Sequence, residues 1–156
     1  MLQDSICNFM KKLFIPPVFV LLSFILIIVF YFVFPEYNVI PFPFNLAGFL
    51  VSFGGFVIMG KARDQFRKYK TTLGMDEATH LICDGIFCRT RNPMYIGMFI
   101  LLLGFGICFG NLYSIASALG FLLVVGLFFI PWEEKMMQDA FGEEYAEYKK
   151  KVRRWV

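Results

Sequence analysis

One stretch of the chain, from Asn92 to Trp132, contains no charged side chain. As a single helix it would be about 60 Å long, which is roughly twice the hydrocarbon thickness of a bilayer. The stretch must therefore fold back on itself, and Gly110-Asn111 is the natural position for the turn. Because a hairpin of two membrane helices returns its ends to the same side, the arginines before the stretch and the glutamates after it are predicted to meet at one membrane surface.

The composition indicates an all-α integral membrane protein. Of the 156 residues, 58% are hydrophobic and 21 are phenylalanine, which is more aromatic surface than a soluble domain of this size can bury. The apolar runs are continuous rather than alternating, so membrane helices are predicted and a β-barrel is not. We expect one domain over residues 1–156 with four transmembrane helices, the last two forming the hairpin, and an amphipathic interfacial helix at the C-terminus.

Prolines, glycines and charges predict the boundaries of these elements. The first half of the segment 61–92 is basic and has apolar residues at helical spacing, so it should extend the second helix until Gly74. The loop that follows should turn at Asp84-Gly85. Glycines at 97, 104, 106, 120 and 126 indicate close packing in the hairpin. The four spans are expected at about 13–34, 44–60, 94–110 and 112–130, with Pro131 ending the last one.

The distribution of charge predicts the orientation in the membrane. Every lysine and arginine lies in the first dozen residues, between Lys61 and Arg91, or after Trp132. The positive-inside rule then places both termini and the segment 61–92 in the cytoplasm. Basic residues at a membrane border attract anionic lipid, so a nucleic-acid partner is not expected. The four cysteines have no metal-ligand or redox spacing, and the only histidine, His80, does not complete one, so no metal is predicted.

The segment 132–154 is predicted to be the interfacial helix, lying on the cytoplasmic surface. Its acidic residues precede its basic residues, as the helix dipole favours. An apolar stripe follows steps of four, three and four residues through Phe141, Tyr145, Tyr148 and Val152.

Two adjacent carboxylates, Glu133 and Glu134, stand at the predicted membrane border together with Arg91. Carboxylates at such a depth are costly unless a ligand or water engages them, which makes them candidates for binding. An acidic start to the C-terminal helix is the alternative explanation for the glutamates. Arg91 has an equally ordinary alternative, because arginines at the ends of spans commonly reach the interface.

An ordered set of short motifs resembles a known family. The set covers roughly Gly60 to the C-terminus and is similar to integral-membrane methyltransferases, which include isoprenylcysteine carboxyl methyltransferases and phospholipid N-methyltransferases. The motifs are Leu81-Ile82-x-x-Gly85-Ile86-Phe87, Arg91-Asn92-Pro93-Met94-Tyr95-Ile96-Gly97, Glu133-Glu134 and Phe141-Gly142-Glu143-Glu144-Tyr145-x-x-Tyr148.

The resemblance implies S-adenosyl-L-methionine as the methyl donor, held in a cytoplasm-facing pocket over the last membrane helices. Arg91 and Glu134 are implied as catalytic residues, with Arg91 holding an anionic acceptor or the carboxylate of the cofactor. Glu133 and Glu134 would bind the ammonium group of the cofactor. Carried over by position, the implied cofactor-binding residues are Leu81, Ile82, Gly85, Asn92, Pro93, Tyr95, Glu133 and Glu134.

The acceptor is left open at this point. The implied acceptor is lipophilic, either the carboxylate of a prenylcysteine-like molecule or a lipid headgroup. The isoprenylcysteine branch carries basic residues before its glutamates, whereas this chain has Phe128–Trp132 there. Arg-Asn-Pro is a common form in bacterial-looking members, which suggests a bacterial or archaeal inner membrane. An NADPH-dependent sterol-type reductase, whose C-terminal region looks similar, and a non-catalytic membrane protein are the alternative functions.

Overall fold

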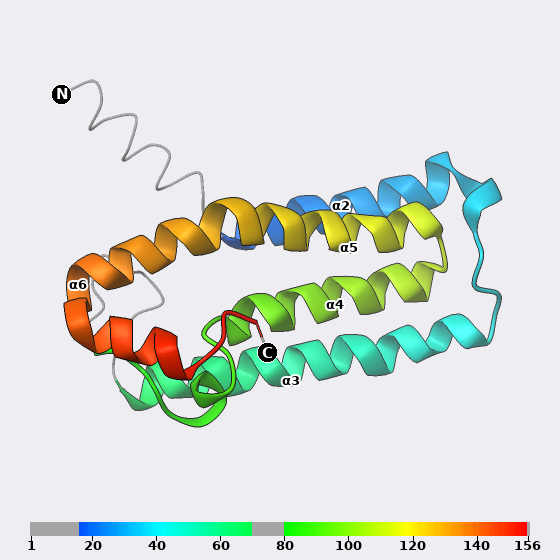
Figure 1. The fold of residues 1–156 in the computed structure, drawn as a ribbon. Coiled ribbons are helices and arrows are strands. Elements are labelled where there is room, and N and C mark those ends of the chain that lie inside the picture. The colour runs from blue at the N-terminus through cyan, green and yellow to red at the C-terminus, as the bar shows by residue number, and fades with distance from the viewer. Residues whose placement is uncertain (1–15, 70–79, 156) are drawn as a thin grey trace, which may run out of the picture.

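The computed structural model describes residues 16–69 and 80–155 and is all-helical, as predicted. Its long helices lie side by side, with the last of them bending back at one end of the molecule (Figure 1). The expected start of the first span at residue 13 and the predicted helix end at Gly74 lie outside the described residues. The long helices are α2 (Pro16–Val33), α3 (Ala47–Lys68), α4 (Pro93–Phe109), and a continuous rod of α5 (Leu112–Val124), the π-helical turn η5 (Val125–Phe129) and α6 (Ile130–Lys151). Short 3₁₀ turns occur at η1 (Pro35–Tyr37), η2 (Phe44–Leu46) and η4 (Gly85–Cys88).

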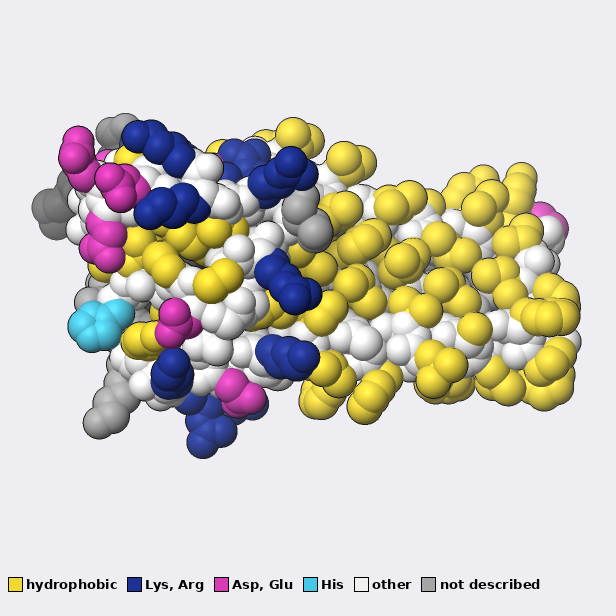
Figure 2. All heavy atoms as spheres, turned by 60° about the horizontal axis from the view of Figure 1, so that its bottom comes forward, with side chains coloured by type: hydrophobic (Ala, Val, Ile, Leu, Met, Phe, Trp, Pro, Cys, Tyr) yellow, Lys and Arg dark blue, Asp and Glu magenta, His cyan; other side chains and the backbone are white. Residues whose placement is uncertain are grey.

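The surface is divided into an apolar part and a charged part. Hydrophobic side chains cover most of the half away from the α6 bend, and charged side chains gather at the other end (Figure 2). Among the described residues, two helical stretches are long and apolar enough to cross a membrane, Phe44–Lys68 and Leu112–Lys151. The apolar helices Pro17–Val33 and Pro93–Phe109 are shorter, so the number of four spans stays a prediction.

The hairpin turns at the predicted position. Gly110 ends α4 with a left-handed backbone (φ 69°), which glycine adopts without a steric cost. Asn111 then caps α5, because its side chain accepts hydrogen bonds from the backbone N–H groups of Tyr113 and Ser114 at 3.0 and 3.2 Å. The same amide donates to the Phe34 carbonyl at 2.7 Å, which ties the turn to the end of α2.

The hairpin glycines make closer contacts with α3 than within the hairpin. A Cβ atom on Gly55 would lie 2.5 Å from the Leu101 backbone nitrogen, and one on Gly97 would lie 2.5 Å from Met59 Cγ. A Cβ atom on Gly104 would likewise lie too close to Ser52 of α3. The predicted packing between the two hairpin helices holds for Gly106, which faces Ile115 and Ser114. Gly97 and Gly104 also serve close packing, as predicted, and the structure shows that their partner is α3.

The second helix extends beyond its apolar part, as predicted. It continues through the basic residues to Lys68. Ala62 on this extension is buried against Ile82 and Phe87 of the following segment, with Phe66 packed beside them. The Asp84-Gly85 turn is also present: Gly85 has φ 60°, and the Phe87 N–H donates to the Asp84 carbonyl at 3.1 Å.

Pro131 does not end the fourth helix, contrary to the prediction. The rod continues through it from α5 into α6, and the π-helical turn Val125–Phe129 lies directly before it. Proline lacks an N–H and its ring clashes with the carbonyl four residues earlier in a regular α-helix. A π-helical turn changes that spacing, so the chain accommodates Pro131 without breaking.

The C-terminal helix also differs from the predicted helix over 132–154. Gly142 has φ 52° and bends α6, and the helix ends at Lys151. The predicted stripe is real, but it packs on the protein: Tyr145, Tyr148 and Val152 form a buried cluster against which Leu81 packs. The bend returns the end of the chain to the beginning of α4 (Figure 1).

Candidate functional site

The two ends of the apolar hairpin meet, as the sequence predicts. At the beginning of α4, Arg91 Nη1 lies 3.1 Å from Glu134 Oε1. One turn further along α4, the Tyr95 hydroxyl donates to Glu133 Oε1 at 2.5 Å. Residues about 40 positions apart therefore form one cluster, and its members come from α4, from the residue Arg91 before it and from α6.

The residues at the start of α4 fix the positions of these side chains. Pro93 occupies the first helical position, where its missing N–H leaves no intrahelical bond unmade. The Asn92 backbone N–H donates to Thr90 Oγ1 at 3.2 Å, and both residues are buried. This corner sets the direction in which α4 leaves, and with it the position of Tyr95 beside Glu133.

Glu134 is neutralised by two arginines. Besides Arg91, Arg154 donates to it through Nε at 3.0 Å and through Nη2 at 2.7 Å, one bond to each carboxylate oxygen. The Glu134 side chain is 12% exposed and that of Arg91 is 10% exposed. Each oxygen of this little-exposed carboxylate therefore has a cationic partner, which compensates for its removal from water.

Glu133 is in a different situation. Among the described residues, no arginine or lysine lies within ion-pair distance of it, and its hydrogen-bond partner is the Tyr95 hydroxyl. Glu133 lies beyond the apolar residues 112–130 but is still largely buried by the protein. Burial raises the pKa of Glu133 to about 7, and the hydrogen bond from Tyr95 opposes that rise. The side chain is therefore suited to receive a cation, which would replace the missing counter-charge.

The Arg91 guanidinium has an N–H donor that no described acceptor uses. Its Nε is buried and has no hydrogen-bond acceptor within the described part of the chain. An unsatisfied buried donor costs free energy, of the order of 1–3 kcal/mol. The cluster therefore combines a carboxylate without a cation and a guanidinium with an unmet donor, which suits a ligand that carries both charges.

The remaining predicted residues divide between this cluster and its surroundings. Pro93 is buried at the helix start. Leu81 packs on the cluster of Tyr145 and Tyr148, so it lies on the α6 side. Ile82 packs with Ala62 and Phe87, and Gly85 lies against Gln65, so both contact α3.

Arg154 is the residue that sequence reasoning missed. It lies beyond the end of α6, whereas the sequence pattern predicts only that its charge belongs to the basic C-terminal end of a helix. The sequence does contain a signal, because the pair Arg153-Arg154 could neutralise the pair of glutamates that stands 20 positions earlier. Without the bend at Gly142, however, nothing places that pair near Glu134.

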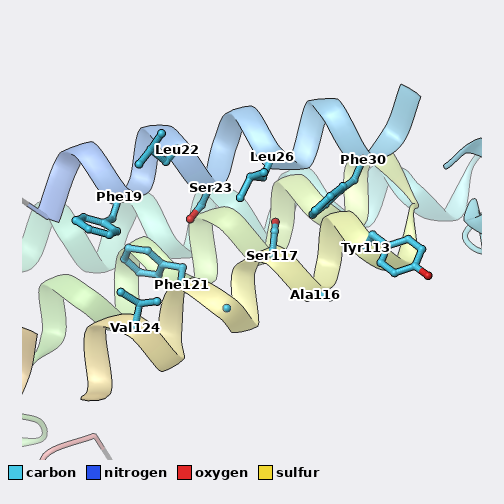
Figure 3. Close-up of a pocket in the computed structure, with 11 residues that line it drawn as sticks. Phe19, Leu22, Ser23, Leu26, Phe30, Tyr113, Ala116, Ser117, Phe121 and Val124 are labelled. Atoms are coloured by element: carbon cyan, nitrogen blue, oxygen red, sulfur yellow. The ribbon is translucent and has the colours of Figure 1, made fainter. Parts of the chain in front are cut away.

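An apolar groove of about 510 Å³ runs between α2 and α5. Figure 3 shows Phe19 and Val124 at one end and Phe30 and Tyr113 at the other. Its Phe19 end is the one nearer α6, because the Phe19 ring packs edge-on against Phe129 with centroids 5.0 Å apart. The lining is almost wholly apolar, so the groove is suited to hydrocarbon.

Comparisons with known proteins point in one direction. A family model described as phospholipid methyltransferase matches residues 44–144. An uncharacterized protein of Haemophilus influenzae is 38% identical over 63 residues, which is 40% of this chain and all of that protein. A protein-S-isoprenylcysteine O-methyltransferase of Schizosaccharomyces pombe is 41% identical over 46% of this chain, and protein-S-isoprenylcysteine O-methyltransferase B of Arabidopsis thaliana is 34% identical over 49%. The chain spans only 30% and 39% of the length of these two enzymes.

A solved structure shares the fold. It is that of the eukaryotic intramembrane Ras methyltransferase ICMT, isoprenylcysteine carboxyl methyltransferase, with a TM-score of 0.65 and 21% identity. The match covers 87% of this chain and 50% of that chain. The helical arrangement in Figure 1 is thus the fold that this methyltransferase also has.

Proposed function

Because the chain belongs to the phospholipid methyltransferase family, whose model matches residues 44–144, we propose that it is a membrane-embedded enzyme that moves a methyl group from S-adenosylmethionine to a lipophilic acceptor. The observation that carries this proposal is the state of Glu133. It is a largely buried carboxylate beside the Tyr95 hydroxyl, and no described arginine or lysine pairs with it. Its neighbour Glu134 has two arginine partners.

The charges of the cluster fit the proposed cofactor. When bound, S-adenosylmethionine supplies a methyl group that its sulfonium already activates, so the protein contributes alignment and electrostatics. Glu133 would bind the ammonium group, with Tyr95 orienting the carboxylate. Arg91 would use its free Nε donor for the cofactor carboxylate or for an anionic acceptor. Asn92, Pro93 and the backbone of Leu81, Ile82 and Gly85 stay predicted to line the same pocket.

Glu134 has a narrower role in this proposal than the sequence suggests. Both of its oxygens accept hydrogen bonds from Arg154, and Arg91 lies against one of them. Glu134 therefore holds the Arg91 guanidinium in place, and Glu133 is left to bind the cation. Substitution of Glu134 should weaken binding by displacing Arg91.

The groove between α2 and α5 supports a lipophilic acceptor. Its Phe19 end approaches the η5 turn that leads into α6, the helix that carries Glu133. Two acceptor types fit, a prenylcysteine-like carboxylate and a lipid headgroup. A carboxylate acceptor needs no general base, whereas an amine acceptor must lose a proton first. Methylation of a lipid extract with labelled cofactor, followed by mass spectrometry of the product, would identify the acceptor.

The two alternative functions make different predictions. A sterol-type reductase would bind NADPH, and a non-catalytic membrane protein would bind neither cofactor. The similar proteins of stated function are methyltransferases, which favours methyl transfer. Calorimetry of the detergent-purified chain with S-adenosylhomocysteine and with NADPH would separate the three.

The central test is substitution of the unpaired carboxylate. Glu133→Gln removes the charge that the cofactor ammonium would face, so affinity for S-adenosylhomocysteine should fall more than about tenfold, the usual effect of losing a charge-assisted hydrogen bond. The matched control is Glu143→Gln, an exposed glutamate on the same helix, which should leave the affinity unchanged. Wild-type binding by both Glu133→Gln and Glu134→Gln would contradict the site assignment.

A further inference from the structure

The chain leaves α6 after Lys151 and returns along the beginning of α4. We call its last described residues, Val152–Trp155, the C-terminal strap (red in Figure 1). Val152 has an extended backbone, with φ −122° and ψ 130°, so the strap is not a frayed last turn of the helix. Its course brings it against the corner that starts α4.

Three consecutive residues of that corner donate hydrogen bonds to the strap. The Arg91 backbone N–H donates to the Arg153 carbonyl at 3.1 Å. Thr90 Oγ1 and Asn92 Nδ2 both donate to the Arg154 carbonyl, at 3.1 and 3.0 Å. Thr90 and Asn92 are buried, so the strap satisfies polar groups that water does not reach.

Trp155 anchors the end of the strap. Its side chain packs on the main hydrophobic core, which is built from α2, α4 and the rod of α5 and α6. A Cβ atom on Gly126 would lie 3.3 Å from Trp155 Cζ2, so the glycine in the π-helical turn leaves room for the indole ring. The strap is thus held at both ends, by α6 and by the core.

Between these anchors, Arg154 holds Glu134 more tightly than Arg91 does. Arg154 binds both carboxylate oxygens, at 3.0 and 2.7 Å, whereas Arg91 approaches one of them at 3.1 Å. A two-point contact fixes the plane of a carboxylate as well as its position. Glu134 in turn contacts Arg91, so Arg154 and Arg91 are connected through this carboxylate.

We propose that Arg154 is a positioning residue of the site. The C-terminal strap holds Arg154, which fixes the carboxylate of Glu134 and, through it, the guanidinium of Arg91. The positive charge of Arg154 also offsets the negative charge of Glu134, so that Glu133 alone remains to bind a cationic ligand. The identity of that ligand rests on the proposed function. The docking of the strap does not. The site is thereby assembled only when the end of the chain is in place.

The first test measures affinity in three full-length variants. Arg154→Ala should weaken S-adenosylhomocysteine binding at least about tenfold, as expected when a charge-assisted contact that orders a site is lost. Arg154→Lys, which keeps the charge but not the planar fork, should recover part of that affinity. The matched control is Arg153→Ala, since Arg153 is exposed and offers the corner its backbone carbonyl.

The outcomes separate positioning from other roles. Equal losses in Arg153→Ala and Arg154→Ala would overturn the proposal, because net charge alone would then explain the effect. Wild-type or tighter binding by Arg154→Ala would also overturn it, and tighter binding would indicate that the strap blocks access of the ligand to the site. If Arg154→Ala does not fold, Arg154→Lys is compared with Arg153→Lys, and equal affinities would overturn the proposal.

The second test needs no cofactor. The chain has two tryptophans, so a Trp132→Phe background leaves Trp155 as the reporter of strap docking. Arg154→Ala in this background should shift Trp155 emission to longer wavelength and increase quenching by acrylamide, and unchanged emission would overturn the docking role of Arg154. If the wild-type chain binds no S-adenosylhomocysteine but the emission shifts, the proposed function fails while the docking role stands.

Discussion

At the scale of the residue, two adjacent glutamates have opposite environments. Glu134 is paired with Arg91 and Arg154, whereas Glu133 has a tyrosine hydroxyl and no described cationic partner. Neighbouring positions on a helix point about 100° apart, so the two carboxylates face different surroundings, but the sequence does not show what lies on either side. The direction of each carboxylate, and so its chemistry, depends on which helix packs against it.

This difference predicts a pH dependence of cofactor binding. The pKa of Glu133 is about 7 in the folded protein without ligand, so the side chain is mostly neutral below that pH and ionised above it. A cationic ligand binds the ionised form, and its affinity should therefore rise with pH, by about tenfold per unit below the pKa, and level off above it. Calorimetric titration with S-adenosylhomocysteine across this range measures the effect.

Two variants sharpen that measurement. Glu133→Gln should remove the pH dependence, because it cannot ionise. Tyr95→Phe should move the rise to higher pH, because the Tyr95 hydrogen bond favours the ionised carboxylate. A wild-type affinity that stays constant from about pH 6 to 8 would show that Glu133 does not bind the cation.

At the scale of the element, α3 and α4 owe their close approach to glycine. Cβ atoms on Gly55 would meet the backbone of Leu101 and of Gly97, at 2.5 and 2.6 Å, so the obstacle is rigid. Since α4 also carries Arg91 and Tyr95 at its beginning, this contact supports the site from the membrane side.

Gly55→Val should therefore force α3 and α4 apart. We expect a loss of stability of about 1–3 kcal/mol, the usual cost of overpacking, seen as a lower melting temperature in detergent. The control is Gly54→Val on the same helix, because a Cβ atom there meets nothing within 4 Å. Equal melting temperatures for the two variants would argue against a tight α3–α4 interface.

At the scale of the whole molecule, charged side chains gather at one end, and the rest of the face seen in Figure 2 is largely apolar. The site lies where α6 returns to the beginning of α4. The positive-inside rule predicts that this end faces the cytoplasm, with both termini on the same side. Four spans over a single domain, in a bacterial or archaeal inner membrane, stay the prediction for residues 1–156.

Cysteine labelling tests that orientation. Cys83 and Cys88 are exposed at the charged end. In a variant with Cys7 and Cys108 replaced by serine, a membrane-impermeant maleimide should therefore label these two cysteines in inverted vesicles and not in intact spheroplasts. Tyr37→Cys in the same cysteine-depleted chain, with Cys83 and Cys88 also replaced, should give the opposite pattern, since Tyr37 is 39% exposed in the loop after α2. Labelling of Cys83 or Cys88 in intact spheroplasts would reverse the predicted topology.

The sequence by itself determined the hairpin and the meeting of its ends. An uncharged run twice as long as a bilayer is thick has to fold back, Gly110-Asn111 supplies the turn, and the charges on either side are then brought together. Packing decided the rest: which glycines face α3, how the helix passes Pro131, and where Arg154 lies. A helix in lipid is apolar on all sides, so its periodicity does not tell which face meets a neighbour. The position of Arg154 depends on one bend at Gly142, and only the folded chain shows that this bend carries the strap back to Glu134.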